Sequence, residues 1–143
     1  MPRQKLYRLI AVSAAAALAA SLGACEPLGP DELKREVDSI HSAAAEGSVL
    51  ADEVGQQETK RIFARVQARE LSDGAEHSAE RLTDAHPADG LNEATSRAID
   101  LADQISAAIG QIERAPDDAP AAAAAAQHLR RLADRTDALA ESL

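Results

Sequence analysis

The stretch LNEATSRAIDLADQISAAIGQI, residues 91–112, decides the fold that we predict for this chain. Its apolar and small residues recur at alternating steps of three and four, which places them on one face of an α-helix. This seam consists of Leu91, Ala94, Ala98, Leu101, Ile105, Ala108 and Ile112, with Ile99, Ala102 and Ile109 beside it. Such a face must be covered by other helices, so the stretch predicts one helix of a bundle.

One loop is predicted before this helix and one after it. Residues 86–90 (HPADG) precede it, and Pro87 disfavours helical backbone at the residue before it. Residues 115–120 (APDDAP) follow it. Asp89 and Asp118 are the predicted N-caps of the helices after these loops, and Pro120 is compatible with a first helical turn.

The same periodicity predicts a helix after the second loop and helical segments before the first. The last seam is Ala122, Ala125, Leu129, Leu132, Thr136, Leu139 and Leu143. The first seam, with Asp31 as its predicted N-cap, is Leu33, Val37, Ile40, Ala44, Gly47, Ala51 and Val54. The second seam is Ala64, Ala68, Leu71, Ala75, Ser78, Leu82 and Ala85, and we expect Ile62, Phe63 and Val66 to widen its buried face.

The first two seams differ in phase across residues 55–61 (GQQETKR), which contain no apolar side chain. The lost phase and Gly55 predict a turn near residues 55–58, and we expect Gly47 to be a weak point within one continuous helix. Four helices of similar length with short loops predict an all-α, up-down-up-down antiparallel four-helix bundle. The alternative is a three-helix, coiled-coil-like arrangement with one long helix over residues 31–85.

The charge of the chain disfavours nucleic acid as a partner. Only Arg3, Lys5 and Arg8 of the 15 basic residues precede Cys25, so 12 basic and all 24 acidic residues follow it, a net charge of −12. Such a charge repels nucleic acid and anionic lipid headgroups, which bind cationic surfaces. Phe63 is the only aromatic residue after Cys25, so the chain also lacks stacking platforms for single strands.

The core must form from few large side chains. With a single cysteine the chain can form no internal disulfide, and Ala, a good helix former, contributes little apolar area per residue. We therefore expect a marginally stable monomer that gains stability from a protein partner or from self-association.

The N-terminal segment has the order of a secretory signal peptide. Residues 1–8 are basic, residues 9–22 (LIAVSAAAALAASL) are an apolar run of 14 residues, and the small residues Gly23 and Ala24 follow. A membrane-spanning helix needs about 20 apolar residues, so a retained transmembrane anchor is the weaker interpretation.

Leu22-Gly23-Ala24-Cys25 resembles the lipobox of bacterial lipoproteins, and the resemblance covers residues 1–25 only. It implies diacylglycerol attachment to the Cys25 sulfur, cleavage before Cys25 and acylation of the new amino terminus. The domains would then be a cleaved signal peptide (1–24), a lipidated tether (25–30) and a bundle (31–143). Two or three acyl chains anchor a protein stably, so the membrane would be a partner through Cys25, on the extracytoplasmic side of the cell membrane or outer membrane.

No constellation in the sequence predicts a catalytic, cofactor or metal site. His41 follows Asp38 by three residues and His77 follows Asp73 by four, spacings at which helical side chains can share a metal. However, the Glu-x-x-His motif of di-metal bundles, the Cys-x-x-Cys-His motif of haem attachment and a Gly-x-Ser-x-Gly nucleophile are all missing from the sequence.

The sequence therefore predicts a lipid-anchored, non-catalytic helical bundle of the bacterial envelope that acts through protein–protein contacts. We identify no small-molecule substrate. The alternative function is a periplasmic bundle that binds a small ligand or metal through His41 and His77.

Overall fold

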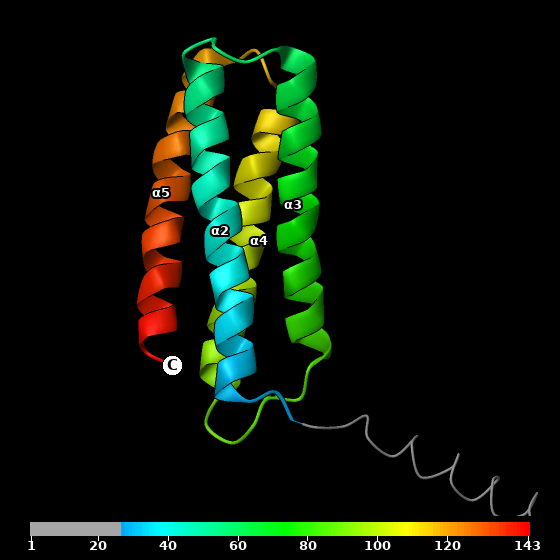
Figure 1. Ribbon diagram of the computed structural model, residues 1–143, viewed down its shortest axis with the longest axis vertical. Coiled ribbons are helices and arrows are strands. Elements are labelled where there is room, and N and C mark those ends of the chain that lie inside the picture. Colours follow the sequence, from blue (N-terminus) through cyan, green and yellow to red (C-terminus); the bar gives the residue numbers. More distant parts are fainter. Residues whose placement is uncertain (1–26) are drawn as a thin grey trace, which may run out of the picture.

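A computed structural model describes residues 27–143, which form four helices. The helices are α2 (Pro30–Gly55), α3 (Arg61–Asp84), α4 (Asn92–Arg114) and α5 (Ala119–Glu141). They run alternately up and down and pack as an antiparallel four-helix bundle (Figure 1), which confirms the predicted fold. The alternative with one helix over residues 31–85 is wrong, because α2 ends at Gly55 and α3 begins at Arg61.

The helices form a ring in which α2 lies against α5 and α3 lies against α4 over the longest contacts. The α4–α5 and α2–α3 pairs close the ring, and α2 also contacts α4 across it. Within the described bundle, α3 contacts α2 and α4 but not α5, so it occupies a corner. We call the end that holds the start of α2, the α3–α4 loop and the C-terminus the base, and the opposite end the top (Figure 1).

The seams predicted from the sequence form the core. Every residue of the first seam is buried, and the largest fully buried side chains are Leu33, Ile40, Leu82, Ile105, Ile109, Leu129 and Leu132. Helix α3 contributes mainly small side chains, since it buries Ala64, Ala68, Ser72, Ala75, Ser78, Ala79 and Leu82. Leu82 is therefore the only large side chain that α3 buries completely.

The prediction that Ile62, Phe63 and Val66 widen the buried face of α3 is wrong. Their side chains are 78%, 54% and 53% exposed. At about 100° per residue they point away from the buried direction that Ala64 and Ala68 define. Because α3 occupies a corner, no described helix covers that side.

The predicted turn between the first two helices is confirmed, but Gln57 rather than Gly55 makes it. Gln57 has a positive φ of 62°, its amide donates to the Val54 carbonyl, and the Glu58 amide donates to the Glu53 carbonyl. These two bonds form a Schellman motif, which satisfies the last carbonyls of α2. Gly55 instead lies against α5, where a Cβ would sit 3.6 Å from the Ala119 carbonyl oxygen.

One of the three predicted N-caps is correct. The Asp118 side chain accepts a hydrogen bond of 3.0 Å from the Ala121 amide at the start of α5, with Pro120 in the first turn as expected. Asp31 is not a cap, because Pro30 already begins α2, and Asp31 instead favours the positive helix end from the first turn. Asp89 is also not a cap, because Gly90 takes a positive φ and α4 begins only after Leu91.

Thr95 supplies a test of the packing around the start of α4. Its buried hydroxyl has no hydrogen-bond partner within residues 27–143, whereas the buried Thr136 hydroxyl donates to the Leu132 carbonyl at 2.6 Å. An unpaired buried hydroxyl destabilises the folded state, so Thr95→Val should raise the free energy of unfolding by about 1 kcal/mol. Thr136→Val, the matched control, should lower it by about 1 kcal/mol in the same urea titration. Equal effects of the two substitutions on the free energy of unfolding would contradict the conclusion that the Thr95 hydroxyl is unpaired and the Thr136 hydroxyl is hydrogen-bonded.

Candidate functional site

Cys25, the predicted lipidation site, lies outside the described residues. The chain joins the bundle at Leu28, whose amide donates to the His86 carbonyl at 2.8 Å and whose carbonyl accepts from the Ala88 amide at 3.1 Å. The Leu28 side chain is buried at the base. The bundle therefore begins within the segment predicted as the 25–30 tether, and two residues, Glu26 and Pro27, separate Leu28 from Cys25.

In the part of the chain that the structure describes, none of the helices combines the length and apolar character needed to span a bilayer.

The two histidines considered as metal ligands lie in different helices. His41, in α2, is half-buried, and its Nδ1 lies 3.1 Å from the Ala133 carbonyl oxygen of α5. This geometry makes Nδ1 the protonated nitrogen, because a carbonyl oxygen can only accept. His77, in α3, is exposed, with Nδ1 3.7 Å from the Glu80 carboxylate. Over residues 27–143, no three His, Cys, Asp or Glu side chains are grouped so that they could hold a metal ion.

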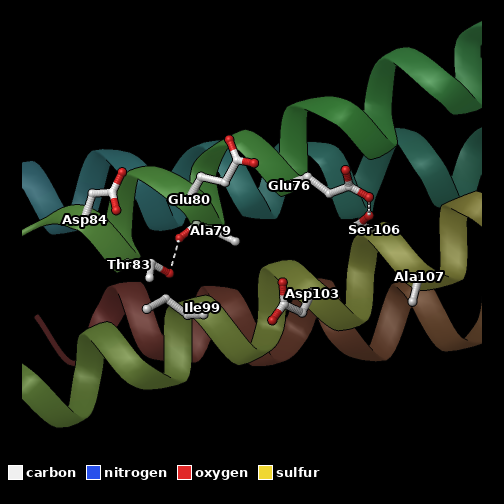
Figure 2. Close-up of a pocket in the computed structure, with 9 residues that line it drawn as sticks. All are labelled: Glu76, Ala79, Glu80, Thr83, Asp84, Ile99, Asp103, Ser106 and Ala107. Atoms are coloured by element: carbon white, nitrogen blue, oxygen red, sulfur yellow. Dashed lines mark hydrogen bonds between the residues drawn. The ribbon is translucent and has the colours of Figure 1, made fainter.

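A cleft of about 700 Å³ lies between α3 and α4. Figure 2 shows its carboxylates, and the cleft is lined by Glu76, Ala79, Glu80, Thr83, Asp84, Ile99, Asp103, Ser106 and Ala107. The Glu80 and Asp84 side chains project from α3 away from Asp103 of α4 (Figure 2). The acidic groups thus spread along the cleft and do not converge on one point.

Hydroxyl groups link the two helices at one end of this cleft. The Ser106 hydroxyl donates to the Glu76 carboxylate at 2.8 Å (Figure 2), and the Ser72 and Ser106 hydroxyl oxygens are 3.0 Å apart. Because Ser106 gives its proton to Glu76, Ser72 is the donor between the two hydroxyls. These bonds satisfy polar groups where α3 and α4 meet, so their role is to join the helices.

A second surface feature lies near the top of the bundle, on α2 and α3. Four apolar side chains are more than half exposed there, and we call them the α2–α3 patch: Val49, Ile62, Phe63 and Val66. Val49 and Phe63 line a groove of about 270 Å³ together with Leu50, Gln67, Glu46 and Glu53. Single exposed apolar residues are ordinary, but a group on adjoining helices is typical of an interaction surface.

Sequence reasoning missed this patch, although a signal for it exists. The seam of α3 continues in phase from Ala64 through Leu82, and Ile62, Phe63 and Val66 fall outside that phase. We assigned them to the core because they are apolar. A strict use of the helical phase would have placed them on the surface.

No protein-family model, curated protein or solved structure matches this chain.

Proposed function

We propose that this chain is a lipid-anchored protein of the bacterial cell envelope, and that its four-helix bundle acts through protein–protein contacts. The observation that carries the anchor is Leu22-Gly23-Ala24-Cys25 directly after the apolar run of residues 9–22. A thiol at this position, flanked by small residues, is the nucleophile that diacylglycerol transfer requires.

The way the chain joins the bundle supports a close attachment. Three residues, Cys25 to Pro27, precede Leu28, whose backbone is hydrogen-bonded to His86 and Ala88. An extended chain spans at most about 3.6 Å per residue. A lipid on Cys25 would therefore hold the base within roughly 10 Å of the bilayer surface. The α2–α3 patch, near the top, would then face away from that membrane and toward other proteins of the envelope.

The Cys25 thiol provides the test of the anchor. In cells fed an alkyne-labelled fatty acid, the wild-type protein should carry the label and partition into detergent with the membranes. Cys25→Ser should lose the label, because the thioether that joins diacylglycerol to the protein needs the cysteine sulfur. A double variant, Cys25→Ser with Ser39→Cys, is the matched control, and it should stay unlabelled because its cysteine lies outside the motif.

Two results would overturn the anchor. One is a wild-type protein that takes up no fatty acid. The other is a Cys25→Ser variant with unchanged labelling and membrane fractionation.

A further inference from the structure

The first half of α3 lacks the residues that usually stabilise the N-terminus of a helix. Lys60, at the N-cap, makes no side-chain cap, and the first turn contains no acidic residue. Lys60 instead places a cation at the positive end of the helix, which destabilises it, whereas Arg61 beside it is paired with Asp117 at 3.1 Å. The large apolar residues of this half also face solvent. A segment that lacks helix-start signals and also exposes large apolar side chains is a candidate binding site, because departures from the folding rules tend to occur at functional sites.

The α2–α3 patch has edges of opposite charge. On the α2 side, the Glu46 and Glu53 carboxylates line the groove that holds Val49 and Phe63. On the other side of α3, the exposed Arg65 precedes Arg69 by one helical turn. Arg69 reaches across to Glu113 of α4 at 2.6 Å, which places this arginine edge on the side away from α2.

We propose that the α2–α3 patch binds an amphipathic helix of a partner protein, with an apolar stripe flanked by acidic residues on one side and basic residues on the other. The apolar stripe would cover Ile62, Phe63 and Val66, as in other complexes where a helix occupies a groove. The acidic flank would meet Arg65, and the basic flank would meet Glu46 and Glu53. This inference deepens the proposed function by naming the contact surface and the chemistry of its partner.

The charges of the chain favour an amphipathic partner helix over an anionic membrane and over a second copy of the chain. Anionic lipid would be repelled by Glu46, Glu53 and the net charge of −12 that remains from Cys25 onward. Two copies of the chain, each with that charge, would also repel one another. A helix with mixed flanks complements both edges, and charge complementarity of this kind sets which partner is accepted.

Three synthetic helical peptides of about 18 residues, roughly 27 Å long, test the proposal. All share one leucine stripe, and their flanks are glutamate and lysine, glutamate only, or lysine only. Binding is measured by fluorescence anisotropy to the full-length protein in nanodiscs of zwitterionic lipid, with empty nanodiscs subtracted. The mixed peptide should bind about tenfold more tightly than either uniform peptide, because each uniform peptide places like charges along one edge.

Variants connect the binding to the patch. Ile62→Ser with Val66→Ser should weaken the mixed peptide at least about tenfold, since both side chains are exposed and their loss leaves the fold intact. Ala124→Ser with Ala138→Ser, at exposed positions of α5, is the matched control and should not change binding. Arg65→Glu puts a carboxylate on the arginine edge, so both edges carry acidic groups and the lysine-only peptide should become the tightest of the three.

The proposal is overturned if the three peptides bind equally, if none binds, or if the patch variant binds as the wild type does. Binding of phosphatidylglycerol vesicles in place of the peptides would identify a membrane surface and overturn it. Concentration-dependent dimers in sedimentation, lost in the patch variant, would identify a second copy as the occupant and overturn it. The Cys25 labelling experiment does not depend on any of these outcomes, so the anchor and the patch are tested separately.

Discussion

Replacing Gly47 with leucine is expected to lower the free energy of unfolding by about 3 kcal/mol. Gly47 lies in the middle of α2, where even a Cβ would come within 2.8 Å of Ile109 Cγ1 and 3.4 Å of Leu129 Cδ1. The core near this glycine has no room for a side chain, so leucine must displace α4 and α5. Urea unfolding followed by circular dichroism at 222 nm measures the change.

Gly74→Leu is the matched control for this experiment. Gly74 is also inside a helix, α3, but a Cβ there would meet no atom within 4 Å. Leucine favours helical backbone over glycine, so Gly74→Leu should raise the free energy of unfolding by about 0.8 kcal/mol. If both substitutions stabilise the protein, the close packing of α2 against α4 and α5 is wrong.

Replacing Leu82 with alanine is expected to lower the free energy of unfolding by about 3 to 4 kcal/mol. Leu82 is 2% exposed and is the only large residue that α3 buries fully, so no neighbouring large side chain on α3 can fill the cavity. The same urea titration measures this loss.

Leu71→Ala is the control on the same helix. Leu71 is only half-buried at the edge of the core, so its truncation should cost about 1 kcal/mol. Equal losses of unfolding free energy at the two positions would contradict the conclusion that Leu82 is the only large side chain of α3 that is fully buried in the core.

The fold could be predicted from the sequence because the periodic apolar seams mark each helix and its buried face. The four seams and the two proline-containing loops lie, to within two residues at their ends, where the structure has helices and loops, and the phase change after Val54 correctly located the first turn. Local backbone geometry was harder to predict. Gln57 adopts the left-handed conformation that glycine usually takes, and Pro30 and Gly90 displaced the caps expected at Asp31 and Asp89.

The candidate sites differ in how far sequence alone could define them. The proposed lipidation motif, Leu22 to Cys25, is continuous in sequence, so it could be proposed without a structure. The α2–α3 patch combines Val49 with residues of the next helix, and it depends on α3 being at a corner that no described helix covers. The helical phase alone predicts that Ile62, Phe63 and Val66 are exposed, but it does not show that Val49 of the preceding helix lies near them.

Photocrosslinking in cells that produce the full-length protein tests the central claim, that the anchored bundle contacts a protein through the α2–α3 patch. A photoreactive residue is placed at Val66 and, as the control, at Ser96, an exposed position near the start of α4. The account predicts one protein crosslinked from position 66 but not from position 96, through an amphipathic helix with acidic and basic flanks. Identical crosslinks from both positions, or none from position 66, would contradict it.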